Sequence, residues 1–200
     1  MEFQEVVHRR RMVRRFRPDP IPVEVVDRLL DNARRGPSAG YSQGQAFLVL
    51  EGADLERFWA VAGAAAGSGV RLAPLVVVPM SSKRVYLDRY AEPDKGWTER
   101  DETQWPVPFW HIDTGMAAML LLLGVVDAGL GALYFGIVPE EVPPFRAAFG
   151  VPEDHDPIGA IAIGYSDEAR QSGSPTHRPR RPWNELVHRG QWGRSSSPND

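Results

Sequence analysis

The sequence predicts an α+β fold, and three observations lead to this prediction. Segments with helical and with strand-like periodicity follow one another in an irregular order, without the strict alternation of a βαβ protein. Residues 111–128 are apolar on nearly every side, which is typical of a long central helix that is buried. With 200 residues, 42% of them hydrophobic, the chain is long enough for one domain with its own core.

The elements follow, in order, from periodicity and from the residues that end helices. Residues 2–10 carry apolar side chains at helical spacing. Pro22 suits the first position of a second helix, which Gly36 and Pro37 end. The further elements predicted are strands over 46–50, 75–78, 131–137 and 158–165, and helices over 54–65, 111–128, 140–149 and 183–188.

One stretch interrupts this order. Residues 79–109 are polar, contain several prolines and aromatic residues, and are predicted to form an insertion or a lid. Residues 1–190 are expected to form a single domain that includes this stretch. Residues 191–200 are expected to form a disordered tail.

Composition excludes several kinds of protein. The chain has no cysteine, which excludes disulfides, thiolate catalysis and Cys-ligated metal centres. The charged N-terminus lacks the apolar segment of a signal peptide, and the longest apolar run, residues 116–126, is too short to span a bilayer. We therefore expect a cytoplasmic protein without a membrane partner.

A cluster of positive charge lies near the N-terminus. Six of the first seventeen residues are Arg, although the whole chain has a formal net charge of −3. Arg presents fixed N–H donors that match phosphate oxygens, so a local cluster indicates a local anion. A solvated basic face and a nucleic-acid surface are the alternatives. Because a nucleic-acid-binding domain is usually basic overall, no nucleic-acid partner is expected.

Patterns for catalytic side chains and for metals are weak. Residues 36–40 match G-x-S-x-G, but they lie between a helix and a strand, the reverse of the order that a nucleophile elbow needs. His111 and Asp113 would diverge on a helix, and the 5 His residues lack metal-binding spacing. We therefore expect neither a catalytic Ser38 nor a metal site.

Four short patterns, taken together, are more specific. Residues 10–16 read RRMVRRF, and residues 37–43 read PSAGYSQ. Residues 128–132 read AGLGA, and residues 163–165 (IGY) are followed by the basic segment 178–182 (RPRRP). In this order they resemble the nitroreductase family of FMN-dependent oxidoreductases, which has R-R-S-[VI]-R-x-F, P-S-A-x-N-x-Q and G-L-G at the corresponding places.

The resemblance implies a fold and an assembly. It implies a three-layer α/β/α sandwich with a mainly antiparallel central sheet, a long buried central helix and an intertwined homodimer. A single FMN-binding domain would cover residues 1–190, and FMN would lie where the two chains meet.

The resemblance also assigns cofactor-binding residues. By their place in the motifs, Arg10, Arg11 and Arg180 would hold the FMN phosphate with help from Arg178, and Arg14 would lie towards the pyrimidine edge of the flavin. Pro37, Ser38 and Ala39 of the partner chain would pack on the flavin, and Gln43 would bind to it. A backbone N–H near Phe135 or Gly136 would point at flavin N5. Met12 is also assigned to the cofactor site. Met12 replaces the Ser of the family and lacks its hydroxyl contact.

Aromatic residues are the candidates for a substrate pocket. They are Tyr41, Trp105, Phe109, Trp110 and Tyr134. Tyr41 replaces an Asn of the family in the loop that borders the flavin. For the other rings, a place in the core or in the dimer contact is the alternative.

The implied reaction is of the ping-pong type. NAD(P)H would pass a hydride to flavin N5 and leave, and a flat aromatic acceptor such as a nitroaromatic or a quinone would take its place. Flavin N5 would be the reactive centre, so no catalytic side chain is implied. A specialised flavin-dependent dehydrogenase or dehalogenase on the same fold is the alternative, and a non-catalytic anion- or nucleic-acid-binding module is a distant one. The sequence does not decide whether the donor is NADH or NADPH, or whether the cofactor is FMN or a deazaflavin.

Overall fold

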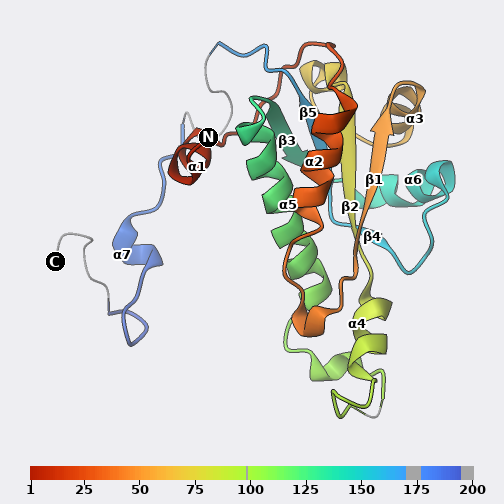
Figure 1. The fold of residues 1–200 in the computed structure, drawn as a ribbon, viewed down its shortest axis with the longest axis vertical. Helices are drawn as coiled ribbons and strands as arrows, with labels where there is room; N and C mark the ends of the chain where they lie inside the picture. The colour runs from red at the N-terminus through yellow and green to blue at the C-terminus, as the bar shows by residue number, and fades with distance from the viewer. Residues whose placement is uncertain (98, 170–176, 195–200) are drawn as a thin grey trace. The chain divides into compact units, whose positions relative to one another are not determined.

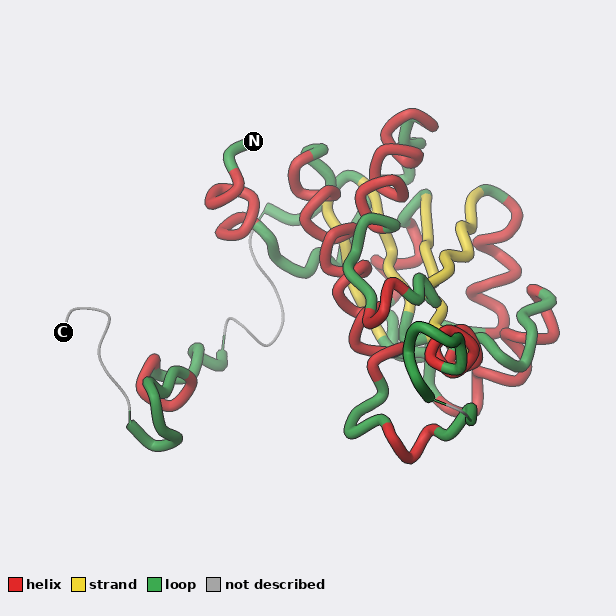
Figure 2. Tube along the Cα trace, turned by 60° about the horizontal axis from the view of Figure 1, so that its bottom comes forward, coloured by secondary structure: helices red, strands yellow, loops and turns green. Residues whose placement is uncertain are grey.

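A mainly antiparallel sheet forms the middle layer of the protein in the computed structural model, which describes residues 1–97, 99–169 and 177–194. The strands are β1 (Gln45–Glu51), β2 (Leu75–Ser81), β3 (Gly131–Phe135), β4 (Asp156–Pro157) and β5 (Ala160–Gly164). Their order across the sheet is β1-β2-β5-β3, with β4 paired to β2, and each of these pairs is antiparallel. Helices cover both faces of the sheet (Figure 1, Figure 2).

Strand β2 lies in the interior of the sheet, and all of its residues are buried. Successive side chains of a strand point to opposite faces. Val76 and Val78 accordingly join the apolar cluster on one face, whereas Val77 joins the cluster on the other. A strand that is covered on both faces requires a continuous apolar run, which is the pattern that predicted it.

Helices α2 (Val23–Ala33) and α5 (Phe109–Asp127) cover one face and lie side by side (Figure 1). The apolar stripe of α2, which includes the buried Leu29, packs on α5 and the sheet. Gly36 follows α2 and lets the chain pass close to α5, because a Cβ at this position would lie 3.0 Å from the Cβ of Ala117.

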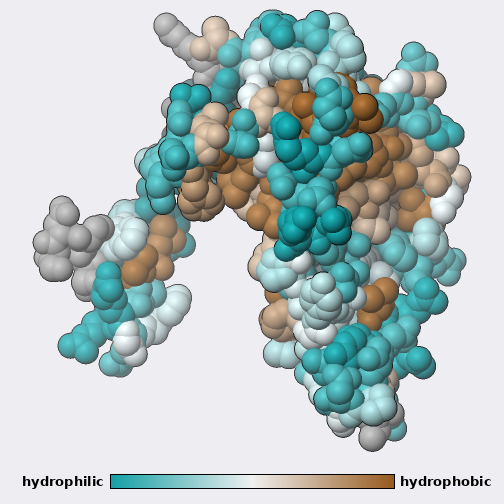
Figure 3. Space-filling model, viewed as in Figure 1, coloured by the Kyte–Doolittle hydropathy of each residue, from teal (hydrophilic) through white to brown (hydrophobic). Residues whose placement is uncertain are grey.

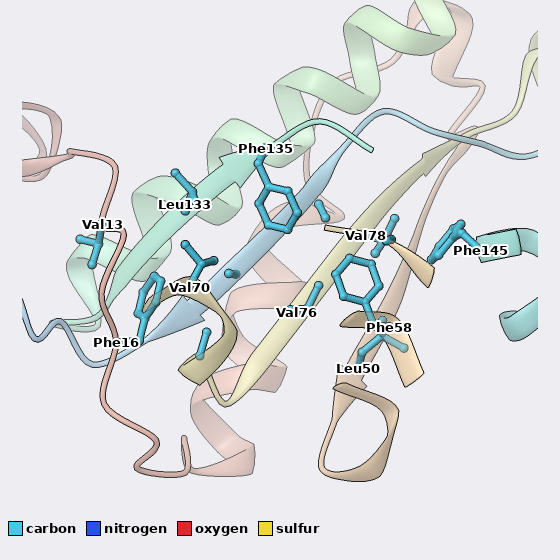
Figure 4. Close-up of a cluster of buried hydrophobic side chains, with 14 of the residues drawn as sticks. Val13, Phe16, Leu50, Phe58, Val70, Val76, Val78, Leu133, Phe135 and Phe145 are labelled. Carbon is cyan, nitrogen blue, oxygen red and sulfur yellow. The ribbon is translucent and has the colours of Figure 1, made fainter. Parts of the chain in front are cut away.

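Helices α3 (Ala53–Val61) and α6 (Val142–Phe149) cover the other face. Phe58 of α3 is fully buried, and its ring lies edge-on to the rings of Phe135 and Phe145, with centroids 6.4 and 6.1 Å away. Figure 4 shows these rings gathered over the sheet. The three layers agree with the predicted sandwich.

The remaining helices are α1 (Phe3–Arg9), α4 (Lys83–Tyr90) and the short α7 (Trp183–Leu186). Contacts divide the chain into two compact units, Met1–Glu168, which contains α1–α6 and the sheet, and Ala169–Asp200, which contains α7. This division does not test whether residues 1–190 form a single domain, which stays a prediction. Of the predicted tail, residues 191–194 are described and residues 195–200 lie outside the described residues.

Two predicted helices have different bounds for local reasons. The helix predicted over 54–65 ends at Val61, because Ala62 is extended and Gly63 follows with a φ of 101°. The helix predicted over 140–149 begins as a 3-10 turn over Pro139–Glu141 before α6.

Strand bounds differ as well. Strand β2 continues to Ser81, so the polar stretch begins after this strand and not at residue 79. The strand predicted over 158–165 is observed as β5 alone, which begins at Ala160 after Gly159, whose φ is 141°, and β4 precedes the predicted range. A Cβ at Gly159 would also lie 2.4 Å from the ring of Tyr134, so glycine is required there on two grounds.

Helix α5 is longer than the apolar run used in the sequence prediction. Within the described part of the chain it is the one helix that is long and apolar enough to cross a membrane, judged by length and composition. The helix begins at Phe109 and therefore extends beyond the apolar run over 116–126. Half of the helix is buried in the structure, as in the core helix of a globular fold.

Candidate functional site

The arginine-rich segment lies along the outer edge of β3. Met12 forms a parallel bridge with Ala132, and the Val13 N–H donates to the Ala132 carbonyl over 2.8 Å. The Tyr134 N–H points at the Met12 sulfur over 3.4 Å. Met12, at the position of the family's Ser, therefore packs against β3 and both apolar clusters.

Burial decides which side chains of this segment reach the surface. Val13 and Phe16 are buried in the core, at 3% and 1% exposed. Arg10, Arg11 and Arg14 are half-buried. Within the described residues the Arg10 guanidinium forms no ion pair, so it is available to an external anion.

Arg11 already binds an anion, the carboxylate of Glu168. Arg11 Nη1 lies 2.6 Å from Glu168 Oε2, and the backbone N–H of Arg14 donates to Oε1 over 2.5 Å. The Glu168 side chain is 4% exposed, and that of Arg11 is 28% exposed. The sequence prediction missed Glu168, although an acidic pair directly after the last strand, opposite in charge to the arginine cluster, was a usable signal.

The loop over 37–43 is held by a second buried carboxylate. Asp113, 2% exposed on α5, accepts from the Ala39 N–H and from the Tyr86 hydroxyl, each with Oδ2 at 2.8 Å. Burial first, and then the adjacent Asp113, raise the pKa of Tyr86, so its hydroxyl stays protonated and donates. Arg89 of α4 adds a bond from Nε to the Gly40 carbonyl over 3.1 Å.

The same loop carries backbone strain. Tyr41 and Gln43 have φ of 57° and 55°, in the left-handed region that residues other than glycine seldom adopt. The Gln43 N–H donates to Ser38 Oγ over 2.9 Å, which closes the loop on itself. Tyr41 is 77% exposed in the single chain, and Pro37 is exposed as well. The loop therefore presents a strained, outward-facing surface.

The end of β3 borders a shallow hollow. Tyr134, Phe135, Gly136 and Ile158 line a space of about 210 Å³. A Cβ at Gly136 would meet nothing within 4 Å, so the backbone there faces open space. The Tyr134 hydroxyl donates to the Ile158 carbonyl over 2.7 Å and braces this hollow.

The aromatic candidates do not converge on one pocket in the single chain. Trp105 lies at the centre of a ring cluster with Tyr86, Tyr90, Trp97, Phe109 and Trp110, at centroid distances of 4.5 to 6.1 Å. This cluster joins the stretch after β2 to the start of α5. Tyr41 lies in the strained loop, and Tyr134 belongs to β3.

The two candidate regions lie towards opposite ends of α5. The loop is bonded to Asp113 near the start of the helix, whereas Arg11 lines a hollow with Val126 and Gly129 at its end. At 1.5 Å per residue, about 20 Å of helix separates the two places. Figure 1 shows α5 running beside α2 along the sheet. Arg178 and Arg180 are exposed and belong to the second unit, so the structure does not place them against Arg10 or Arg11.

Comparison with known proteins agrees with the observed fold and with the family that the four sequence motifs resemble. The family model described as "Nitroreductase family" matches residues 7–165. A protein of Methanothermobacter thermautotrophicus, provisionally named an NADH dehydrogenase/NAD(P)H nitroreductase, is 30% identical over 171 residues, which cover 84% of this chain and 79% of that protein. The chain belongs to the nitroreductase family, a class of oxidoreductases.

Solved structures show the same fold. A nitroreductase family protein of Clostridium difficile 630 has a TM-score of 0.72 at 22% identity, over 96% of this chain and 99% of that one. A protein of Clostridium difficile R20291, titled an FMN-dependent nitroreductase, has a TM-score of 0.68 at 21% identity, over 94% and 98% of the two chains. At these identities the likeness concerns the fold.

Replacing Tyr86 with Phe tests the support of the loop. The change removes one of the two donors to the buried Asp113 carboxylate. We expect the free energy of unfolding to fall by about 1–3 kcal/mol, measured by urea denaturation. Tyr90→Phe is the matched control on the same helix, since the Tyr90 hydroxyl forms no hydrogen bond among the described residues. Equal losses in both variants would contradict the role given to Asp113.

Proposed function

We propose that the protein is an FMN-dependent NAD(P)H oxidoreductase that reduces a flat aromatic acceptor such as a nitroaromatic or a quinone. The observation that carries this proposal is the anion site of residues 10–14, in a chain of the nitroreductase family. The names of a relative and of a structural neighbour, one an NAD(P)H nitroreductase and one an FMN-dependent nitroreductase, support the donor and the cofactor.

The residues present fit an FMN phosphate. The segment already holds a carboxylate with one guanidinium and one backbone N–H, which demonstrates a donor set for an oxyanion. Arg10 adds a guanidinium without an ion pair among the described residues. We assign the phosphate to Arg10 and Arg11. The roles of Arg178 and Arg180 stay predictions from the sequence.

The remaining residues would orient and shield the ring system. FMN, when bound, supplies a centre that accepts a hydride and passes it on. Arg14 would place positive charge at the pyrimidine edge, and the open backbone at Gly136 would donate an N–H to the ring. Pro37, Ser38 and Ala39 would cover the ring and exclude water, and Gln43 would bind its edge. The side chains that would face the acceptor are those of Tyr41, Trp105, Phe109, Trp110 and Tyr134.

We propose that the site is completed by a second copy of the chain. In one chain the arginine segment and the loop lie towards opposite ends of α5, so a homodimer is needed to bring one copy of each together. The outer face of α5 supports this assembly, since Ile112, Met116 and Met119 are 42%, 39% and 45% exposed at positions that share one helical face. Figure 3 shows apolar residues exposed among hydrophilic ones on the side where α5 and α1 lie.

Flavin absorption tests the proposed function. Purified protein, or protein incubated with FMN, should show flavin absorption that NADH or NADPH bleaches without air. Mass spectrometry of the released cofactor separates FMN from a deazaflavin. Addition of a nitroaromatic or a quinone should restore the absorption. Protein that neither contains nor takes up FMN would refute the proposal.

Replacing Arg10 with Ala tests the phosphate assignment. The change removes one charge-assisted contact, so FMN affinity should fall by roughly 1.5–3 kcal/mol, measured by quenching of flavin fluorescence. Arg57→Ala is the control, because Arg57 is exposed on α3 and paired with Asp54. Unchanged FMN affinity in the Arg10 variant would show that the phosphate lies elsewhere.

Replacing Met116 with Asp tests the assembly. A charge in the apolar stripe of α5 would have to be buried without a partner, so the dimer should dissociate to monomers. Light scattering after size-exclusion chromatography measures the mass. Val23→Asp is the control at a 70% exposed position on α2, and it should stay dimeric. A monomeric wild-type protein, or two dimeric variants, would count against the interface.

A further inference from the structure

Glu168 connects the arginine segment to the last strand of the sheet. It follows β5 closely and is the last residue of the first compact unit. Its carboxylate oxygens accept from different partners, Oε2 from Arg11 Nη1 at 2.6 Å and Oε1 from the Arg14 backbone N–H at 2.5 Å. Arg11 Nη2 also reaches the Glu168 carbonyl over 3.4 Å. One side chain therefore holds both a guanidinium and the main chain of the candidate phosphate site.

The carboxylate is buried and its partner is not. The side chain of Glu168 is 4% exposed, and that of Arg11 is 28% exposed. A buried carboxylate is costly unless each oxygen receives good hydrogen bonds, which these two donors supply. An anion arriving from solvent would therefore meet the guanidinium of Arg11 and not the carboxylate behind it.

The backbone around Glu168 is anchored. Ser166 forms an antiparallel bridge with Phe16, and the Asp167 N–H donates to the Arg15 carbonyl over 2.9 Å. The Arg17 N–H donates to the Tyr165 carbonyl over 2.9 Å. Residues 165–168 and 14–17 are thus paired along their length, which holds Glu168 in place next to Arg11.

This anchoring has a consequence for Arg11. A free Arg side chain loses rotamer entropy when it is fixed on a ligand. In the structure two of its nitrogens are already held by Glu168, and a guanidinium has five N–H donors, so others stay available to an oxyanion. The carboxylate fixes the guanidinium before a ligand arrives.

We propose that Glu168 is a positioning residue for phosphate recognition, which acts by holding the Arg11 guanidinium and the Arg14 backbone in the conformation that binds the FMN phosphate. The inference rests on the proposed function. The opposite hypothesis is that the carboxylate competes with the phosphate for the same donors. The two hypotheses predict opposite changes in FMN affinity when the charge of Glu168 is removed: a loss if Glu168 positions the donors, and a gain if it competes for them.

The test compares FMN with riboflavin, which has the same ring system without the phosphate. In Glu168→Gln, a change that keeps the shape and removes the charge, the Kd of FMN should rise roughly tenfold or more. The Kd of riboflavin should change by much less. Asp167→Asn is the matched control, since Asp167 is the adjacent acid, 52% exposed and paired with Arg15. It should bind both flavins as the wild type does.

A second variant shows whether Glu168 acts through Arg11. Arg11→Lys keeps the charge and loses the fork of donors, so Glu168→Gln should have a smaller added effect on FMN binding in that background. Thermal unfolding of each variant without flavin confirms that the proteins compared are folded.

Each other outcome contradicts the inference in its own way. Tighter FMN binding in Glu168→Gln would establish competition. Equal losses for FMN and riboflavin would show a general structural role, and unchanged FMN binding would show no role. A wild-type protein that binds neither flavin would refute the proposed function, and the inference with it, before any variant is made.

Discussion

The candidate site depends on the pairing of residues 12–17 with parts of the chain that are far away in sequence. Val13 bonds to Ala132, Phe16 to Gly69 and Arg17 to Tyr165. These bonds hold the segment against β3 and the neighbouring loops, and Val13 and Phe16 are both buried in the same apolar cluster. The arginines reach the surface because their neighbours are in the core. Their placement is thus a consequence of hydrophobic burial, and charge decides only what they can bind.

Two buried carboxylates fasten the two halves of the candidate site in the same manner. Glu168 accepts from one side chain, Arg11, and one backbone N–H. Asp113 accepts from one side chain, Tyr86, and one backbone N–H. In each case the donors offset the desolvation of a carboxylate that is nearly inaccessible. In each case the carboxylate also binds the backbone N–H of a residue outside the named strands, Arg14 or Ala39.

The long helix α5 sets the distance between these halves. It is buried on one face against α2 and the sheet, and on the other face it exposes an apolar stripe. The distance between the two ends of this helix is larger than the width of one binding pocket. The same element therefore provides the core of one chain and the surface on which we propose that a second chain docks.

The fold could be predicted from local patterns to a large extent. The apolar run over 75–78 and the nearly all-apolar 111–128 predicted the central strand and the central helix, because burial on both sides demands such runs. The motifs at residues 10–16 and 37–43 indicated the family to which the chain belongs. Element ends were less predictable. Gly159, for example, precedes β5 with a φ of 141° and lies close to Tyr134 and Phe135, which are distant in sequence.

The sequence by itself determined the layers, the family and a local excess of positive charge that calls for an anion. Only the tertiary structure decided that Arg11 faces Glu168, that Asp113 of the apolar helix binds the N–H of Ala39, and that Trp105 lies within a ring cluster. The partners in these contacts lie 15 to 157 positions apart in the sequence, and no common periodicity relates them. Periodicity reports which side of an element is buried, whereas a pairing across the fold depends on how the whole chain is packed.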